Sequence, residues 1–291
     1  MTTRLAWVSA TEARGQDPDE ELALPALKRA GFEVDVVAWD DPAAAWATYD
    51  QVVLRSTWDY PRRLGEFQAW LVRVAAVTDL RNPLPMLRWS LDKHYLSDLD
   101  QAGVPITATV FAEPGDRRPA LPDDDFVVKP AVGAGSKDAA WYAPAQRDEA
   151  YAHVARLHAA GVTALIQPRV RSVPVDGEWP LVFLGGSYSH AATKRVDLPQ
   201  AGAVTGLFAE ETTQPYEATP DQIAVARAAV DVVTTRFGVP TYARVDLIRA
   251  DDGRPRVLEL ELVEPSLFLP EAPPDTADRL AEALRSSHAA R

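Results

Sequence analysis

An alternating pattern of polar and apolar residues at positions 241–269 constrains the fold of this chain more than any other feature. The segment reads TYARVDLIRADDGRPRVLELELVEPSLFL, and Asp252-Gly253 separates its two alternating runs. An Asp-Gly pair in this position is a strong signal for a β-hairpin with a two-residue loop. We therefore expect two antiparallel strands, at residues 242–248 and 257–263.

A two-residue loop fixes which residues of this hairpin face each other. It places Asp246 opposite Glu259 and Arg244 opposite Glu261, and the alternation of a strand puts these four side chains on one face. The other face is apolar and is expected to enter a core. It carries Ala243, Val245 and Leu247 against Leu258, Leu260 and Leu262.

The charged face of the hairpin has two interpretations. Opposed carboxylates lie about 5 Å apart at Cβ and repel each other unless a cation lies between them. Magnesium would supply that cation, because it binds a few carboxylates together with substrate phosphates. The alternative is a solvated face on which Arg244 bridges Glu261, and a longer loop would shift the register.

The remaining pattern predicts a parallel α/β unit followed by α+β structure. A turn-rich linker is expected at residues 81–85, followed by a short helix at residues 90–102. Before the linker we expect strands at 5–8, 34–37 and 51–54 and helices at 20–30 and 67–77. After it we expect further strands at 126–128, 164–166 and 181–184 and helices at 146–160, 220–237 and 275–290.

The composition excludes several classes of protein. The 291 residues carry 30 Lys+Arg against 42 Asp+Glu, a net charge of −12, which argues against a nucleic-acid or anionic-membrane partner. The absence of cysteine excludes disulfides, thiolate zinc sites and cysteine nucleophiles. No apolar run approaches the roughly 18 residues of a membrane span, and the first ten residues do not resemble a signal peptide. We therefore expect a cytoplasmic protein.

A second group of residues suits an anion. The run FVVKPAVGAGSK delivers Lys129 from a strand into a loop of small residues that contains Gly133, Gly135 and Ser136. Such a loop lets backbone N–H groups approach a phosphate closely. It matches neither the P-loop nor the dinucleotide fingerprint, and a tight turn between strands is the alternative.

Other candidate residues are weaker when taken one at a time. Lys93 stands at the expected start of helix 90–102, and Lys194-Arg195 follow a strand pair; each has a solvated surface cation as its alternative. Gln167 and Val170 follow a buried strand and could offer polar groups to a flat ligand.

In their order along residues 84–269, these motifs resemble the ATP-grasp superfamily, in the manner of glutathione synthetase and related carboxylate–amine ligases. The resemblance implies a small parallel α/β domain at residues 1–84 and an ATP-grasp domain at 85–291. The latter comprises two α+β lobes that clasp a nucleotide, a central lobe at about 90–168 and a C-terminal lobe at about 169–291.

The resemblance also implies a role for each motif. Lys93 and Lys129 are similar to the lysines that grip the nucleotide phosphates, and the loop with Gly133, Gly135 and Ser136 to the one that closes over them. Gln167 and Val170 match the adenine hinge, and Glu178 the ribose acid. Lys194 or Arg195 resembles the γ-phosphate cation and Arg244 the transition-state arginine, while Asp246, Glu259 and Glu261 match the metal ligands. Glu261 replaces an asparagine of many relatives.

The implied activity is an ATP- and magnesium-dependent ligase that uses two Mg²⁺ ions. It would phosphorylate the carboxylate of a small amino-acid-like substrate, and an amine would then displace phosphate to form a C–N bond. The alternatives are an ATP-grasp small-molecule kinase and a nucleotide-binding sensor without turnover. The sequence does not decide whether the chain forms a homo-oligomer.

The acceptor site is expected at Arg55, Ser56 and Thr57, which follow a strand of the first domain. Arg55 could bind a substrate carboxylate in a bidentate manner, and a packing turn is the alternative. This stretch, with GEWPLVF and LELVEPS, resembles the ATP-grasp branch that contains the cycloserine-forming cyclo-ligase. That branch implies antibiotic biosynthesis and ring closure of O-ureido-serine.

Overall fold

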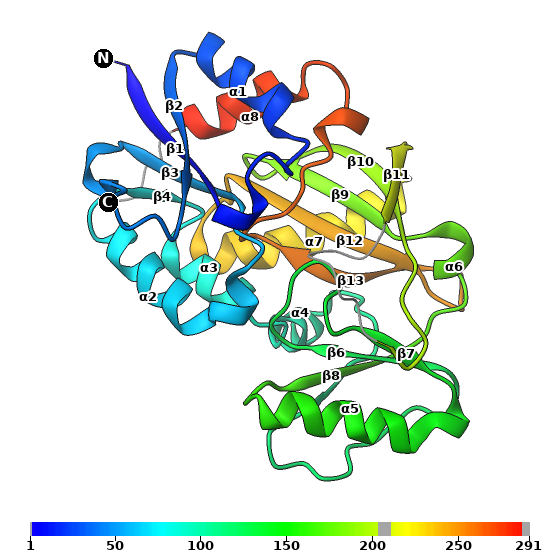
Figure 1. Ribbon diagram of the computed structural model, residues 1–291. Helices are drawn as coiled ribbons and strands as arrows, with labels where there is room; N and C mark the ends of the chain where they lie inside the picture. The colour runs from blue at the N-terminus through cyan, green and yellow to red at the C-terminus, as the bar shows by residue number, and fades with distance from the viewer. Residues whose placement is uncertain (1, 203–210, 287–291) are drawn as a thin grey trace.

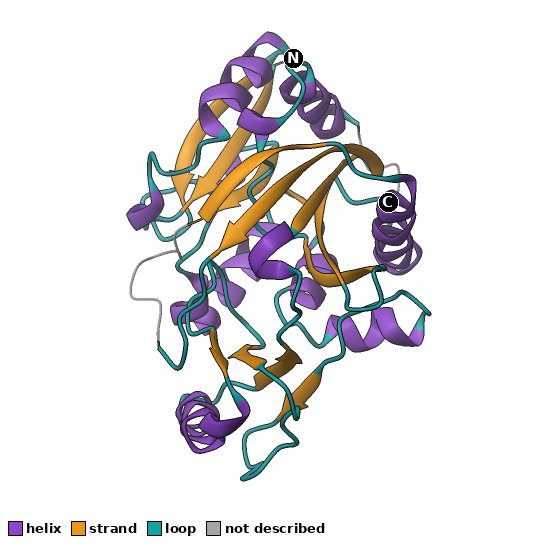
Figure 2. Cartoon of the chain, turned by 90° about the vertical axis from the view of Figure 1, so that its right-hand side faces the viewer, coloured by secondary structure: helices purple, strands orange, loops and turns teal. Residues whose placement is uncertain are grey.

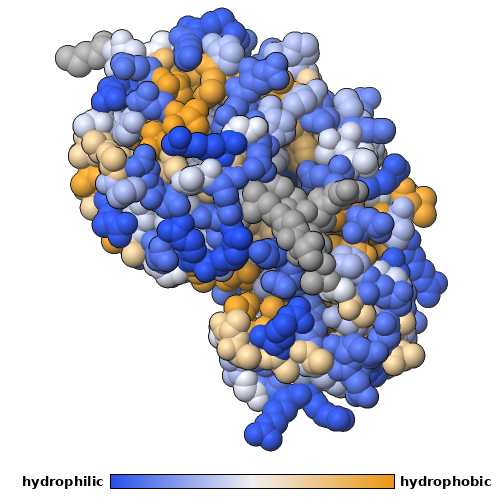
Figure 3. All heavy atoms as spheres, viewed as in Figure 1, coloured by the Kyte–Doolittle hydropathy of each residue, from blue (hydrophilic) through white to orange (hydrophobic). Residues whose placement is uncertain are grey.

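Three β-sheets follow one another through the molecule (Figure 1). The structure is a computed structural model that describes residues 2–202 and 211–286. Seen after a quarter turn, the small lower sheet and its helix stand apart from the two larger sheets above (Figure 2). Polar side chains cover most of the face in Figure 3, and the outline narrows where the lower lobe joins the rest. None of the helices in the described ranges combines the length and apolarity that a membrane crossing needs.

The first sheet is parallel, as its sequence pattern predicts. Its strands lie in the order β2-β1-β3-β4, and helices α1 and α2 connect them because their apolar stripes need cover against the sheet. The elements are β1 (Thr3–Ser9), α1 (Glu20–Arg29), β2 (Phe32–Ala38), β3 (Gln51–Ser56), α2 (Leu64–Ala75) and β4 (Asp79–Arg81).

The connection after β4 differs from the expected linker and single helix. Asn82 is fully buried and joins the first sheet to the central one: its side chain donates to the carbonyls of Tyr242 and Leu262 and accepts from the Thr241 amide. The expected helix is two helices, α3 (Leu84–Ser90) and α4 (Tyr95–Gln101). The chain turns between them, where Asp92 accepts from the His94 amide at 3.0 Å. Lys93 lies in this break.

The lower lobe is a four-stranded antiparallel sheet with one helix on its face. Its order is β5-β8-β6-β7, and α5 covers it through Val154 and Leu157, which join a core with Phe126 and Ile166. The elements are β5 (Val110–Ala112), β6 (Phe126–Pro130), β7 (Ala140–Tyr142), α5 (Arg147–Ala159) and β8 (Ala164–Pro168).

The central sheet has five strands in the order β11-β10-β9-β12-β13. Helix α7 covers one face and contributes Ala226, Val230 and Val233 to the largest core, so the opposite face is left for the site. The elements are α6 (Val173–Asp176), β9 (Trp179–Leu184), β10 (Ser187–Val196), β11 (Glu211–Tyr216), α7 (Pro220–Phe237), β12 (Tyr242–Arg249) and β13 (Pro255–Glu261).

The β12–β13 hairpin has the predicted register at the site but not at its loop. Arg244 pairs with Glu261 and Asp246 with Glu259, as expected. The loop, however, is one residue longer, because Ala250 pairs with Arg254 and Gly253 takes a φ of 82°. A β-bulge at Leu258 restores the register, since Leu247 pairs with Val257. Val257 therefore enters the core in place of Leu258, because a bulge turns the extra residue out of the alternation.

The last helix, α8 (Thr276–Arg285), packs beside α1 of the first sheet (Figure 1). Arg29 pairs with Asp278 at 2.7 Å, and the buried Arg81 donates to the carbonyls of Ala283, Leu284 and Ser286. Short 3₁₀ helices complete the described chain at Thr11–Ala13, Trp46–Thr48, Tyr60–Arg63, Pro144–Gln146 and Leu269–Glu271.

Candidate active site

A cavity of about 740 Å³ lies where the central sheet, the lower lobe and the loop after β3 meet. That volume suits a nucleotide-sized ligand. The structure brings most of the candidate residues to its wall: Lys93, Lys129, Gly133, Gly135, Ser136, Gln167, Val170, Glu178, Lys194, Arg195, Arg244, Glu259 and Glu261. It does not bring Asp246, Arg55, Ser56 or Thr57 there.

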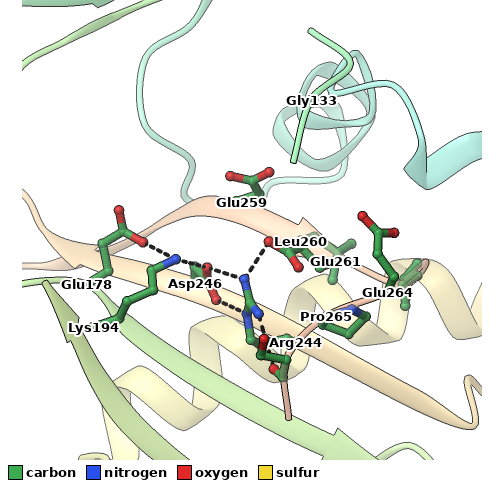
Figure 4. Close-up of polar contacts among 12 residues, drawn as sticks. Gly133, Glu178, Lys194, Arg244, Asp246, Glu259, Leu260, Glu261, Glu264 and Pro265 are labelled. Atoms are coloured by element: carbon green, nitrogen blue, oxygen red, sulfur yellow. Dashed lines mark hydrogen bonds and ion pairs between the residues drawn. The ribbon is translucent and has the colours of Figure 1, made fainter. Parts of the chain in front are cut away.

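Charges of alternating sign cross the floor of the cavity (Figure 4). Lys194 of β10 lies between Glu178 and Asp246, with Nζ–O distances of 2.7 and 2.9 Å. Arg244 of β12 lies between Asp246, at 2.8 Å from Nε, and Glu261. The row crosses the sheet from β10 through β12 to β13, because side chains two residues apart on one strand, or opposite each other on paired strands, lie on the same face.

Asp246 is the anchor of this row. It is 1% exposed, and both of its carboxylate oxygens accept hydrogen bonds from Arg244 and Lys194. Burial alone would raise its pKa, but the two cations outweigh burial and hold the pKa well below the ordinary value. The same pairing raises the pKa of Lys194 against the effect of burial. Asp246 thus stays charged and holds both cations in place.

Two lysines face Glu259 at the next position of the floor. Lys93 Nζ lies 2.8 Å from a Glu259 oxygen, and Lys129 Nζ lies 3.8 Å from the other. Burial opposes ionisation, yet these lysines lower the pKa of Glu259 to about 2. Lys93 is 7% exposed, so it is not the solvated surface cation that was its alternative interpretation, because the break between α3 and α4 turns it inward.

The neighbouring acids have the opposite tendency. Burial raises the pKa of Glu261 to about 7 despite Arg244. Burial, followed by the charge of Glu261, raises the pKa of Glu264 to about 8. Burial is thus the main reason that these two carboxyl groups keep their protons to a higher pH than a free glutamate does.

The carboxylates fit a magnesium ion in part. Glu259 and Glu261 line the cavity, and magnesium is ordinarily bound by one or two carboxylates that share it with substrate phosphates. Asp246 lies beneath them with its oxygens committed to Arg244 and Lys194. Accordingly, over residues 2–202 and 211–286, no group of three or more acidic or histidine side chains is gathered as a metal site.

The small-residue loop lies over the lysines. Lys93 Nζ donates to the Gly133 carbonyl at 3.2 Å, so one lysine contacts both the loop and the floor. Gly135 and Ser136 take φ values of 62° and 58°, a left-handed backbone that is strained for a serine. The loop thus has the tight curvature that lets backbone amides face an anion.

The other candidate residues lie toward the lower lobe. Gln167 is 2% exposed and donates to the Thr109 hydroxyl at 2.9 Å. Glu178 is paired with Lys194 and is therefore part of the charged row. Arg195 is exposed and donates to the Val175 carbonyl, so Lys194 is the more buried cation of the pair.

Arg55 occupies a different place from the one expected. It is 1% exposed, pairs with Asp19 at 2.9 Å and donates to the Pro265 carbonyl at 2.7 Å. Ser56 and Thr57 are fully buried. The strand end predicted to meet a substrate is thus packed beneath the loop that follows β13, and Arg55 holds that loop instead.

Trp58, Tyr60 and Glu264 also line the cavity and received no role from the sequence. The first two follow the Arg55 stretch directly, and Glu264 lies in the LELVEPS run. The sequence does contain a signal for Glu264. It is an acidic residue shortly after a strand whose other acidic residues are expected to face a ligand.

Comparisons with known proteins agree with one another. The family model described as "D-cycloserine synthetase DcsG, N-terminal domain" matches residues 5–82. The cycloserine biosynthesis protein DcsG of Streptomyces lavendulae is 39% identical over 292 residues, covering 96% of this chain and 97% of that protein.

Solved structures give the same result. The crystal structure of D-cycloserine synthetase DcsG matches with a TM-score of 0.88 and 38% identity, over 97% of this chain and 98% of that one. D-alanine–D-alanine ligase from Bacillus anthracis matches with a TM-score of 0.68 and 14% identity, over 97% and 96% of the two chains. The latter likeness concerns the fold alone.

Proposed function

This chain belongs to the DcsG family of ATP-grasp ligases, and we propose that it closes the ring of cycloserine or a close analogue from an amino acid such as O-ureido-serine. Membership confirms the family and the fold class that the motifs predict, and the chain is an ATP-dependent ligase. The substrate, the metal and the role of each residue are part of the proposal.

The charged floor of the cavity is the observation that carries the proposal. Lys93, Lys129, Lys194 and Arg244 converge on one space in which Glu259 and Glu261 are exposed to a ligand. The triphosphate of ATP would replace these carboxylates as the partner of the lysines, because phosphate oxygens are strong acceptors for ammonium groups. Glu259 and Glu261 would then hold the two magnesium ions, which would supply positive charge to neutralise the phosphates.

The chain's own groups would position and stabilise the reacting atoms. A substrate carboxylate oxygen attacks the γ-phosphorus of ATP, ADP leaves, and an acyl phosphate forms. The substrate nitrogen next attacks the acyl carbon, phosphate leaves and the nitrogen loses a proton, which closes the C–N bond. When the substrate is O-ureido-serine, hydrolysis of the carbamoyl group on that nitrogen to carbon dioxide and ammonia completes the conversion to cycloserine. Arg244 and Lys194, fixed by Asp246, are placed to stabilise the charge that develops in both steps.

The remaining site residues bind the rest of the nucleotide. The loop with Gly133, Gly135 and Ser136 covers the phosphates, while Gln167 and Val170 border adenine. Glu178 is near the ribose once Lys194 turns to phosphate. The lining of the cavity supports this arrangement, because it includes Gln167, Val170 and Glu178 together with the loop.

Turnover of candidate substrates tests the proposal. ADP and a ring-closed product should appear with ATP, Mg²⁺ and O-ureido-serine, and Lys129→Met should lower kcat/KM for ATP at least about 100-fold. Lys28→Met, an exposed lysine on α1, is the matched control. ADP with a stable phosphorylated product would instead identify a kinase, and ATP binding without turnover a sensor.

A further inference from the structure

Glu264 is a buried carboxyl group at the wall of the cavity that forms no ion pair within the described residues. It is 7% exposed and lines the cavity. In Figure 4 its side chain points into the same space as that of Glu259, at the opposite end of the row from Glu178. Glu178, Asp246, Glu259 and Glu261 each have a lysine or arginine nitrogen within 4.0 Å, whereas Glu264 has none in the part of the chain that the structure describes.

The surroundings of Glu264 are aromatic. Trp58 and Tyr60, from the loop after β3, line the cavity beside it. The Trp58 Nε1 donates to the Glu264 carbonyl at 3.3 Å, and the Tyr60 hydroxyl donates to its carboxylate. A carboxylate in such a place is costly without a positive partner, while aromatic faces favour a bound cation. The pocket thus suits an organic ammonium group.

Glu264 lies in the loop that follows β13, and Arg244 is hydrogen-bonded to the same loop. Arg244 Nη1 donates to the Ser266 carbonyl at 3.1 Å and Arg55 donates to the Pro265 carbonyl. Asp19 accepts from the amides of Leu267 and Leu269 at 2.6 and 2.8 Å. The loop therefore places the carboxyl group of Glu264 two residues before Ser266, whose carbonyl accepts from the guanidinium of Arg244.

We propose, on the premise of the ligase function above, that Glu264 binds the α-ammonium group of the substrate and so selects free α-amino acids. An α-amino acid carries its ammonium and carboxylate groups on one carbon. With its ammonium at Glu264, its carboxylate is directed toward Arg244 and the transferred phosphoryl group. Arg55 and Asp19 are positioning residues for this receptor, which accounts for their burial beneath the loop.

Paired substrates test the proposal on the unaltered protein. O-ureido-serine and its analogue without the α-amino group differ only in that group. The wild type should favour the amino compound in kcat/KM by about 10- to 100-fold, the range expected from one charge-assisted contact. In Glu264→Gln this preference should fall to about two-fold or less, with KM for ATP unchanged. Asp197→Asn, an exposed acid on the cavity rim, is the control and should keep the preference.

Direct binding separates this proposal from the proposed function. Calorimetric titration of both compounds, in the presence of a non-hydrolysable ATP analogue, needs no turnover. Tighter binding of the amino compound by wild type but not by Glu264→Gln supports the receptor even if no product forms. Equal use or equal binding of the two compounds by the wild type would overturn it, even if the ligase reaction is confirmed. If the wild type binds neither compound, both proposals fail.

Discussion

At the scale of single residues, the site is held together by charged side chains that share one face of the central sheet. Asp246 satisfies Arg244 and Lys194 together, so it fixes both cations before any ligand arrives. Preorganised charge of this kind stabilises a transition state without reorganisation at the moment of reaction. It also means that catalytic groups and stability cannot be separated at this position.

Replacing Asp246 with asparagine should therefore destabilise the fold. The substitution removes the anion shared by the buried Arg244 and the largely buried Lys194, and breaking a buried pair costs about 3 to 5 kcal/mol. The free energy of unfolding in urea should fall by about 3 kcal/mol. Asp252→Asn, which breaks an exposed contact with Arg256, should leave it unchanged. A stable Asp246→Asn variant would show that the row is not held as described.

A pH-dependent prediction concerns His153 of α5. It is 2% exposed, and its Nδ1 lies 2.8 Å from the Tyr142 hydroxyl. Burial lowers its pKa from 6.5 to about 4. The unfolded chain then binds a proton at a higher pH than the folded one, so stability is lost as pH falls from about 6.5 toward 4. This contribution amounts to at most about 3 kcal/mol.

The comparison of wild type with His153→Gln isolates that contribution. The difference in unfolding free energy between the two proteins should change between pH 7 and pH 4.5, with the wild type losing more. His158→Gln is the control, because His158 lies on the same helix but is only partly buried. An identical pH slope in wild type and His153→Gln would contradict the prediction.

At the scale of elements, the sequence predicted what depends on local pattern and missed what depends on distant contacts. The pairing of Asp246 with Glu259 follows from alternation and a turn signal. The bulge at Leu258 does not follow from local pattern. It arises because the longer hairpin loop must be fitted to β12, which is already paired with β9 on its other side. The turn that buries Lys93 and the burial of Arg55 under the Pro265 carbonyl depend likewise on segments far away in the chain.

Removal of the bulge residue tests this account of the hairpin. Without Leu258, Val257 is followed directly by Glu259, so Asp246 can still face Glu259 and the core alternation is kept. The deletion of Leu258 should give a folded protein with a circular dichroism spectrum like that of the wild type. Deleting Leu260 instead moves Leu262 to the polar face and should abolish cooperative unfolding. Equal damage by both deletions would argue against a bulge at Leu258.

At the scale of the whole molecule, helix α8 near the end of the described chain packs against the first domain. Helix α8 joins α1 and the first sheet in one core with β9 of the central sheet. The boundary at residue 84 predicted from the sequence therefore crosses a shared core, and Asn82 and Arg81 add hydrogen bonds across it. The loop that carries Glu264 also lies between these parts, so substrate binding depends on their packing as one body.

Replacing one leucine of α8 with alanine should lower the unfolding temperature of the whole molecule, and unfolding should remain a single transition. Leu280 is fully buried between α1 and the sheets, and a Leu→Ala change at such a site costs about 3 kcal/mol through lost burial and the cavity left behind. Because the core is shared, near-UV circular dichroism, tryptophan fluorescence and calorimetry should report one transition at a lower Tm for Leu280→Ala. Arg285→Ala, at the exposed end of the same helix, should leave Tm near that of the wild type. A first sheet that melts separately, while the central sheet keeps the wild-type Tm, would show that the two parts fold independently and that the loop bearing Glu264 is not positioned by Arg55 and Asp19.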